Sequence, residues 1–345
     1  MLTDIFAYRY ANRELWSGWT EAENKLLVQC FRLVSEQVLP YSNAEGKPIE
    51  SARTAWQQIH DRLSMELGLE YLSPQYTVQQ HGGFYEWTPD WRCRHFVLAS
   101  FNQGQPPDRF IKERISLIEL AMRSREEELT AIKADLPARI ARAELGDSLL
   151  LHRLRLPGSQ ADGMRSYIRS LNQNFSGSVD ELNERFRRAG APLNYHNGFI
   201  QIVTDQLVES RVEGPFWKLV ADPKWNSVDR DMKEALDLRD ANAGDPALYA
   251  AKALESAIKI ISDSKGWTRG AETGAAAYID NLVSQKNGSF VRAWEGDALK
   301  MFFKQVRNPL GHGTGNQPPL ALTSAQTDWA IETCMVWIRS LLARI

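Results

Sequence analysis

Residues 245–267 read DPALYAAKALESAIKIISDSKGW and form the clearest helical pattern in this chain of 345 residues. Pro246 suits the first position of a helix, and Asp245 before it is a favoured capping residue. Apolar side chains then recur three and four positions apart, which places them on one helix face. These residues are Ala250, Leu254, Ala257, Ile258 and Ile261. The stretch therefore predicts an amphipathic helix with one buried stripe.

Similar patterns extend the helical prediction along the chain. Thr20 and Glu23 form a capping box for a helix that ends at Pro40, and a second helix runs from Ser51 to a C-terminal cap at Gly68. Pro137 is expected to separate the next two helices. The further helices are expected at residues 110–137, 138–151, 178–190, 226–242, 245–263, 275–285, 296–306 and 323–344. The sequence therefore predicts a mainly α fold.

Two regions depart from the helical pattern. Residues 81–101 combine paired glycines with many aromatic side chains, which is typical of short strands or an aromatic-packed loop. Ser178 and Glu181 are expected to cap a short helix, and Asn197 and Gly198 after it predict the tight turn of a β-hairpin. We expect this helix and hairpin to form a small central α/β element with no function of its own.

The composition is that of an ordinary folded protein, with 43% apolar and 24% charged residues. Its three cysteines, Cys30, Cys93 and Cys334, are far apart and odd in number, so we expect free thiols in a reducing compartment. No apolar run reaches the length of a signal peptide or a membrane span. We therefore expect a cytoplasmic protein that makes no membrane contact.

The net charge of −2 is unevenly distributed along the chain. Residues 245–345 carry 11 Lys and Arg against 9 acidic residues, whereas residues 1–106 carry 9 against 12. A mildly basic segment permits RNA contact at a local patch. The low overall charge argues against tight, sequence-blind binding that depends on phosphate charge alone.

Residues 306–313, VRNPLGHG, are the most informative stretch for function. They follow an apolar helix, and Pro309 and Gly311 are expected to break it, so that His312 lies on a non-helical turn. Such a turn can direct Arg307 and His312 toward one site. An arginine and a histidine five positions apart also occur by chance in many chains, so the surrounding sequence must supply the rest of the argument.

That surrounding sequence resembles the C-terminal domain of abortive-infection proteins, which belongs to the HEPN superfamily of RNA-associated helical domains. The resemblance covers residues 245–315 and implies a HEPN helical bundle over residues 244–345. It implies that Arg307, Asn308 and His312 form the catalytic motif and that Glu255 on an earlier helix supports them. The residues that carry it are Asp245, Pro246, 253–259 (ALESAIK), Gly266, Trp267, Val306, Arg307, Asn308, His312 and Gly313.

The N-terminal region is similar to the domain that is often fused to this one in AbiJ-like proteins. The similarity rests on the opening helix pair and on residues 115–121, ISLIELA, an aliphatic helix with one acidic residue. It implies no chemistry. Together the two resemblances divide the chain into an AbiJ-like helical domain at residues 1–135, a central linker and α/β region at 136–243, and the HEPN domain at 244–345.

The implied reaction is RNA cleavage without a metal or a cofactor. The ribose 2′-hydroxyl is the nucleophile, so a general base and a charge stabiliser suffice. His312 can exchange protons at neutral pH, and Arg307 can bind the phosphorane oxygens. Asn308 would orient the histidine or a phosphate oxygen, and Glu255 would hold the guanidinium. The resemblance implies 2′,3′-cyclic phosphate and 5′-hydroxyl ends on an RNA substrate.

The resemblance also implies partners. A single motif offers one base, and members of this superfamily commonly pair two motifs, so we expect a homodimer. The apolar terminal helix with Trp329 and Trp337 either buries a second face in that dimer or completes the bundle core, and core packing is favoured. A toxin-type enzyme in antiphage defence must also be held inactive, which implies a phage-derived trigger or a neutralising partner.

Several alternatives stay open. In one, the C-terminal domain is a non-catalytic HEPN module that binds RNA or protein, and Arg307 and His312 are structural. In another, the chain is a helical interaction protein with no RNA role. A zinc site at Cys93, His95 and His81 lacks a fourth ligand at a familiar spacing. Aromatic residues 84–101 suit base stacking, but packing in the core is favoured.

Overall fold

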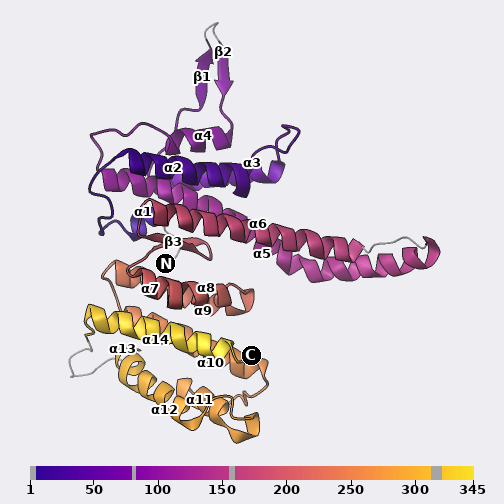
Figure 1. Cartoon of the computed structure of the whole chain (residues 1–345), viewed down its shortest axis with the longest axis vertical. Helices are drawn as coiled ribbons and strands as arrows, with labels where there is room; N and C mark the ends of the chain where they lie inside the picture. The colour runs from indigo at the N-terminus through magenta and orange to yellow at the C-terminus, as the bar shows by residue number, and fades with distance from the viewer. Residues whose placement is uncertain (1–4, 80–82, 155–159, 312–320) are drawn as a thin grey trace. The chain divides into compact units, whose positions relative to one another are not determined.

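The computed structural model describes residues 5–79, 83–154, 160–311 and 321–345. The chain folds as two compact units, an N-terminal unit that ends at Ile202 and a C-terminal unit, Val203–Ile345. Both are mainly α, as predicted, and the strands of the described chain pair as two antiparallel hairpins (Figure 1). This division has two parts, whereas the sequence pattern suggested three with boundaries at 135 and 243. One long helix continues through residue 135, and the second hairpin belongs to the same unit as that helix.

The N-terminal unit is a helical layer with two hairpins. Its helices are α1 (Phe6–Arg9), α2 (Glu21–Leu33), a π-helical turn (Val34–Val38), α3 (Glu50–Glu66), α4 (Pro89–Val97), α5 (Pro107–Leu154) and α6 (Gln160–Arg188). Its strands are β1 (Tyr76–Gln79) paired with β2 (Gly83–Glu86), and β3 (Leu193–His196) paired with β4 (Phe199–Ile202). Helices α5 and α6 lie side by side over much of their length (Figure 1).

Several local predictions for this unit are confirmed. The Thr20 hydroxyl accepts a hydrogen bond from the Ala22 N–H at 3.1 Å, and the Thr20 N–H donates to Glu23 Oε2 at 2.7 Å, so the capping box is formed. Gly68 follows α3 at φ +68°, where a left-handed residue closes the helix. Asn197 and Gly198 both have positive φ, 43° and 92°, as a type I′ hairpin turn requires.

Other local predictions for this unit are wrong. Helix α5 runs through Pro137, since a proline removes only one backbone hydrogen bond and long helical segments on both sides hold the rest. Ser178 lies inside α6, where its hydroxyl donates to the Asn174 carbonyl at 3.1 Å instead of capping a new helix. Part of the predicted strand or loop region, residues 89–97, is the helix α4.

The core of the N-terminal unit centres on α5. The apolar side chains of Ile111, Ile115, Ile118 and Met122 recur three and four positions apart on this helix and have no solvent exposure. Trp56 of α3 is also fully buried, and its indole N–H donates to the Leu39 carbonyl at 2.9 Å. Satisfying this polar atom allows the largest side chain of the helix to lie in the core.

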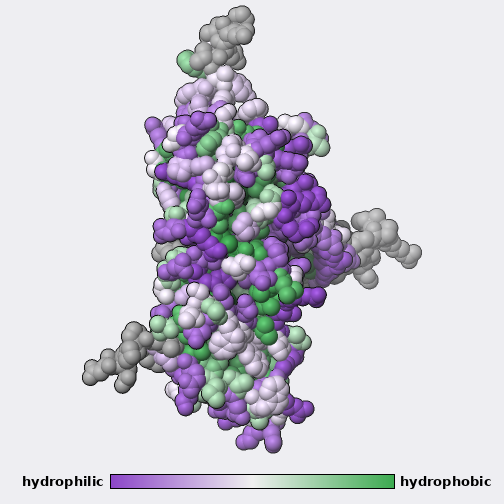
Figure 2. All heavy atoms as spheres, turned by 60° about the vertical axis from the view of Figure 1, so that its left-hand side comes forward, coloured by the Kyte–Doolittle hydropathy of each residue, from purple (hydrophilic) through white to green (hydrophobic). Residues whose placement is uncertain are grey.

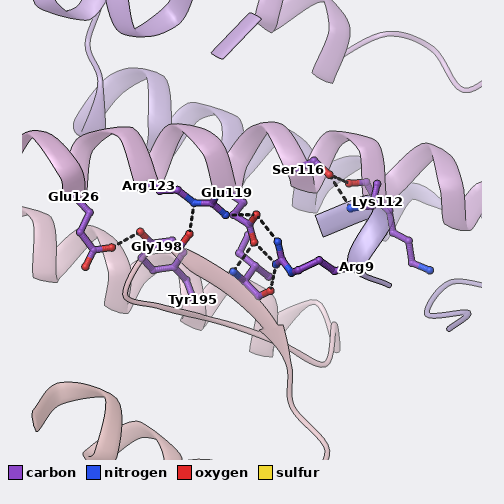
Figure 3. Close-up of polar contacts among 10 residues, drawn as sticks. Arg9, Lys112, Ser116, Glu119, Arg123, Glu126, Tyr195 and Gly198 are labelled. Carbon is purple, nitrogen blue, oxygen red and sulfur yellow. Dashed lines mark hydrogen bonds and ion pairs between the residues drawn. The ribbon is translucent and has the colours of Figure 1, made fainter. Parts of the chain in front are cut away.

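A second face of α5 is polar, and it organises the rest of the unit (Figure 3). We call this face the polar stripe of α5; its members stand three or four positions apart and are Asp108, Lys112, Ser116, Glu119, Arg123 and Glu126. The N-terminal segment binds to it at several points. Ser116 accepts the Ala7 N–H at 3.0 Å, and the buried Lys112 ammonium donates to the Tyr10 carbonyl at 2.8 Å. The stripe therefore fixes a segment that has little regular structure of its own.

Glu119 is the centre of this stripe and is fully buried. Arg9 of α1 donates to its two oxygens at 3.0 and 2.5 Å, and Arg123 donates at 2.8 Å. The Ile200 N–H of β4 donates to Glu119 at 2.8 Å, and Arg9 donates to the Ile200 carbonyl at 2.9 Å. Burial opposes ionisation of Glu119, but the two guanidinium charges and these hydrogen bonds outweigh it, so its pKa lies below the ordinary 4.5. One carboxylate thus joins α1, α5 and the second hairpin.

The hairpin is also attached through its other strand and its turn. Arg123 donates to the Gly198 carbonyl at 2.8 Å, and the Tyr195 hydroxyl donates to Glu126 at 2.6 Å. The Phe199 ring lies 4.0 Å from the Arg123 guanidinium and 5.1 Å from that of Arg9, within the range of cation–π attraction. The polar stripe therefore holds both strands of the hairpin.

The C-terminal unit is a bundle around α10. Its helices are α7 (Gln206–Val208), a π-helical turn (Glu209–Glu213), α8 (Gly214–Val220), a 3₁₀ turn (Pro223–Trp225), α9 (Asn226–Asp240), α10 (Pro246–Ser264), α11 (Ala275–Val283), a 3₁₀ turn (Gln285–Asn287), α12 (Ala293–Phe302), a second π-helical turn (Phe303–Arg307), α13 (Asn308–Gly311) and α14 (Ser324–Leu342). Helix α10 packs against α9, α11 and α14.

The buried stripe predicted for α10 is confirmed. Ala250, Leu254, Ala257, Ile258 and Ile261 all have no solvent exposure. Pro246 is at the first position of the helix, as predicted, but the Asp245 side chain makes no capping hydrogen bond there. The proline alone supplies the favourable start, because its missing N–H has no partner at this position in any helix.

The surface drawn in Figure 2 is mostly hydrophilic, with apolar side chains showing in patches between the polar ones. None of the helices in the described ranges is both long enough and apolar enough to cross a lipid bilayer.

Several carboxylates are buried together in the C-terminal unit. Glu209 and Glu213 are one turn apart, and Asp240 of α9 is 2% exposed. Burial, followed by the hydrogen bond and the charge of Glu209, raises the pKa of Glu213 well above the ordinary 4.5. Arg239 lies 3.9 Å from Glu213 and opposes this rise only in part. Burial beside Glu209 therefore favours the protonated form of Glu213 over the charged form.

We expect Glu119→Gln to lower the free energy of unfolding by about 3 kcal/mol at pH 7, because it leaves two buried guanidinium groups without their charge partner. The pKa of Glu119 is lowered by folding, so its contribution is present above pH 4.5 and is lost as the pH falls through the folded value. The free energy of unfolding is measured by urea denaturation of wild type, Glu119→Gln and the exposed control Glu127→Gln. Equal stability of the two variants at pH 7 would contradict it.

We expect Glu213→Gln to stabilise the protein, increasingly so as the pH rises above the ordinary glutamate value of 4.5. Folding raises the pKa of Glu213, so its full contribution to the free energy of unfolding is present below pH 4.5. This contribution decreases as the pH rises, because the unfolded state then ionises more readily than the folded state. Glutamine keeps a donor toward Glu209 without that cost. Thermal unfolding against pH, with the exposed Asp297→Asn as control, measures the effect. A difference in Tm between wild type and Glu213→Gln that does not depend on pH would contradict this explanation.

Candidate active site

Arg307 lies at the end of the π-helical turn that joins α12 to α13. The N–H of Asn308 donates to the Phe303 carbonyl, so the turn contains one extra residue. Such turns are frequent at functional sites, because they redirect side chains inside an otherwise regular helix. Pro309 then occupies the second position of α13, which directly continues this turn. The predicted break at Pro309 and Gly311 is therefore wrong, since the backbone stays helical through Gly311.

Glu255 lies on α10, is 8% exposed and faces the π-helical turn. Its Oε2 is 3.3 Å from Nη2 of Arg307. The structure therefore brings together two of the four predicted site residues, although 51 positions separate them in the sequence. A carboxylate beside a guanidinium holds it by charge and by hydrogen-bond geometry.

Lys259 is a third member of this cluster, and the sequence prediction omitted it as a site residue. Its ammonium lies 2.7 Å from Oε1 of Glu255, one helical turn away on α10, and 5.6 Å from the ring of Tyr278. A glutamate followed four positions later by a lysine is a known helix-surface pair, so the spacing was a signal that could have found it. Glu255 is thus shared between two cations.

The Arg307 guanidinium is held in place but keeps donors for a ligand. Its side chain is 25% exposed, and its Nε is buried without a hydrogen-bond partner among the described residues. A methyl group at Gly311 would lie 3.4 Å from Nη1 of Arg307 and 3.5 Å from Leu248, so the α13 turn packs closely on the guanidinium. Nη2 of Arg307 lies beside Glu255, and the exposed edge of the guanidinium can donate hydrogen bonds to an oxyanion.

The other two predicted site residues are not part of the observed contacts. Asn308 is exposed at the first position of α13, next to Arg307 in the chain. His312 lies outside the described residues, so its predicted role stays a prediction. Lys304, three positions before Arg307, is exposed and adds a positive charge to the same segment.

The structure gives little support to the zinc alternative. Cys93 is buried, with its Sγ 3.9 Å from the Trp56 carbonyl, whereas His95 packs on the Trp87 ring. His81 lies outside the described residues. Among the residues that the structure describes, no group of three or more His, Cys, Asp or Glu side chains is placed to hold a metal ion.

The aromatic residues of the region 84–101 divide into two groups. Phe96 is buried and Phe101 packs against the core, as predicted. Phe84, Tyr85 and Trp91 are 79%, 55% and 54% exposed, so the prediction of core packing is wrong for them. Phe84 and Tyr85 belong to a two-stranded hairpin, which has too few strands to bury both of its faces.

Helix α14 completes the core of the C-terminal unit. Ile331, Met335, Ile338 and Leu341 are buried. Trp329 at its beginning is 56% exposed and lies 6.1 Å from the Phe302 ring of α12. The helix therefore contributes to the core, as favoured from the sequence, and leaves one large aromatic side chain on the surface.

A comparison with protein-family profiles matches residues 4–218 to the family described as AbiJ N-terminal domain 4. The chain belongs to this family. The match confirms the predicted AbiJ-like, abortive-infection N-terminus and extends it beyond residue 135 to the whole N-terminal unit and the first helices of the C-terminal unit. It ends before Glu255 and Arg307. No curated protein and no solved structure matches the AbiJ-type chain.

Proposed function

We propose that this AbiJ-family chain is an abortive-infection endoribonuclease and that residues 244–345 form a HEPN domain that cleaves RNA without a metal. The observation that carries the proposal is the contact between Glu255 and Arg307. The resemblance to HEPN domains requires a glutamate on one helix to support an arginine on another, and these two side chains lie 3.3 Å apart. A chance occurrence of the motif would not require this contact.

The proposed reaction uses the nucleophile that RNA itself carries. His312 removes the proton of a ribose 2′-hydroxyl, O2′ attacks the adjacent phosphorus, and the bond from phosphorus to the 5′-oxygen breaks. The 5′-oxygen leaves with a proton from the general acid that the second motif of the proposed dimer supplies, which gives a 2′,3′-cyclic phosphate and a 5′-hydroxyl. Asn308 orients the histidine or a phosphate oxygen.

Arg307 stabilises the negative charge that the phosphate oxygens gain in the transition state. Its position is set by Glu255 on one side and by the close approach of Gly311 on the other. Lys259 neutralises the second oxygen of Glu255, so this carboxylate supports the arginine without repelling the phosphate. The site therefore presents a net positive charge from Arg307, Lys259 and Glu255 together.

The proposed enzyme requires control, since indiscriminate RNA cleavage would kill the cell. We assign this control to the AbiJ-type region, with a phage-derived trigger or a neutralising partner as its ligand. We also propose a homodimer, because one motif supplies a base but no separate acid for the leaving oxygen. Exposed Trp329 and Met301, 56% and 60% exposed, offer apolar surface for it.

The proposal predicts that His312→Ala and Arg307→Ala abolish RNA damage in cells during phage challenge. Loss of a general base costs about 10²- to 10⁴-fold in rate. Wild type, both variants and the exposed control Lys265→Ala are expressed at equal level, and growth and total RNA integrity are followed. Wild type and Lys265→Ala are expected to fragment RNA and limit phage spread, whereas the site variants are not.

Equal growth and intact RNA in all four strains during challenge would contradict the nuclease. Binding of RNA by purified wild type without cleavage would then support a non-catalytic HEPN module. Loss of cleavage in excess chelator would contradict the metal-independent mechanism.

For the dimer, we expect Trp329→Glu to shift the protein to a monomer in sedimentation analysis, because a charge on an apolar interface is costly. Trp91→Glu, which changes an equally exposed tryptophan of the N-terminal unit, is expected to leave the dimer intact. A wild type that is strictly monomeric at working concentration would count against a composite site.

A further inference from the structure

Helix α10 carries two lysines on the face that contacts Arg307. Lys252 stands three positions before Glu255 and Lys259 four positions after it, so each lies one helical turn from Glu255 on the same face. Seven residues of α-helix span about 10 Å along the axis. Because Arg307 contacts Glu255, its guanidinium lies between the two lysines. We call Lys252, Arg307 and Lys259 the cation row of α10.

An aromatic ring restrains each lysine of the row. The Lys252 ammonium lies 4.2 Å from the centre of the Tyr249 ring, one turn earlier on the same helix. The Lys259 ammonium lies 5.6 Å from the centre of the Tyr278 ring of α11. Both distances are within the range of cation–π attraction. A side chain that is restrained in this way loses less conformational entropy when it binds a ligand.

Lys259 keeps donors for a ligand although it pairs with Glu255. Its side chain is 41% exposed, and an ammonium group carries three N–H donors. The carboxylate of Glu255 is shared between Lys259 and Arg307. One negative charge therefore offsets only part of the charge of these two cations.

Lys252 is partly exposed and makes no ion pair among the described residues. Its charge lowers the pKa of Asp231 on α9, which burial raises by more. The Asp231 carboxylate lies 3.7 Å from the guanidinium of Arg230. The acid nearest in effect to Lys252 thus has a cation of its own, and the ammonium of Lys252 remains able to bind an anion.

Three separated cations in a row fit a ligand that repeats its negative charge at intervals. One phosphate group occupies one such cation and leaves the others unused, whereas a nucleic-acid strand offers a phosphate at every nucleotide. The low net charge of the whole chain, −2, means that such contacts depend on local clusters like this one.

We propose that Lys252 and Lys259 bind the phosphates on either side of the phosphate that Arg307 holds. The substrate is then an RNA strand that presents at least three consecutive phosphates to α10. The assignment rests on the proposed function, because it takes the phosphate at Arg307 to be the one that is cleaved. The two lysines do not take part in the reaction; they hold the strand in register with Arg307.

Fluorescence anisotropy of the full chain with labelled 2′-O-methyl oligoribonucleotides tests the proposal, since the methyl group removes the nucleophile and prevents cleavage. A tetranucleotide with three phosphates is expected to bind at least about tenfold more tightly than a dinucleotide with one. The logarithm of its association constant is expected to fall with the logarithm of salt concentration at a slope of about −2, because each phosphate contact of a single strand contributes about 0.7. Equal affinity for both probes, or no tetranucleotide binding at millimolar concentration, would overturn the proposal.

Lys252→Gln is the decisive variant, because Lys252 does not contact Glu255. It is expected to weaken tetranucleotide binding about threefold to tenfold and to reduce the salt slope by about 0.7, with no effect on the dinucleotide. Lys259→Gln is expected to reduce the slope equally, and Lys259→Arg, which keeps the charge, to retain it. The control Lys218→Gln, at an exposed position of α8, is expected to change nothing. An unchanged salt slope in Lys252→Gln would refute the proposal.

This failure and the failure of the nuclease give different results. If wild type fragments RNA during phage challenge and Lys252→Gln keeps the wild-type salt slope, the assignment of Lys252 and Lys259 is wrong and the nuclease stands. If the predicted slopes are found for a protein that never cleaves RNA, the two lysines bind phosphates as proposed and the nuclease is contradicted.

Discussion

The N-terminal unit depends on one buried carboxylate. Glu119 has no solvent exposure, and it survives there as an anion because Arg9, Arg123 and the Ile200 N–H surround it. A buried ion pair of this kind is weak evidence for net stability, since desolvation offsets much of the attraction. Its consequence is geometric, because the Arg9 guanidinium of α1 and the Ile200 N–H of the second hairpin meet on the same carboxylate of α5. The family match covers all three elements that this carboxylate joins.

Much of the fold could be predicted from the sequence where the signal is local. The Thr20 capping box, the Asn197–Gly198 turn and the apolar stripes of α5 and α10 depend on neighbouring residues, and all are present. The predictions at Pro137 and Ser178 were wrong because both residues are tolerated inside a long helix. Helical segments on either side of Pro137 span its one missing hydrogen bond, and the Ser178 hydroxyl donates to the Asn174 carbonyl. The role of Glu119 could not be predicted, since two of its partners, Arg9 and the Ile200 N–H, come from sequence positions far before and after it.

At the candidate site, too, some features could be predicted from the sequence and others could not. The resemblance to HEPN domains suggested Glu255 and Arg307, and the structure places them in contact. The π-helical turn that positions Arg307 could not be predicted, because a π turn has no strong sequence signal. Pro309 and Gly311 instead suggested that the helix ends there. Lys259 could have been predicted from a simple spacing rule, because it stands four positions after Glu255 on the same helix.

The central claim is that the ribose 2′-hydroxyl attacks the phosphate at a site built by Arg307, Glu255 and His312. The most direct measurement is the end chemistry of RNA fragments from phage-challenged cells that express wild type or His312→Ala. The account predicts fragments with 2′,3′-cyclic phosphate and 5′-hydroxyl ends in the wild type, and their absence in the variant. Fragments with 3′-hydroxyl and 5′-phosphate ends, or the same fragments in both strains, would contradict it.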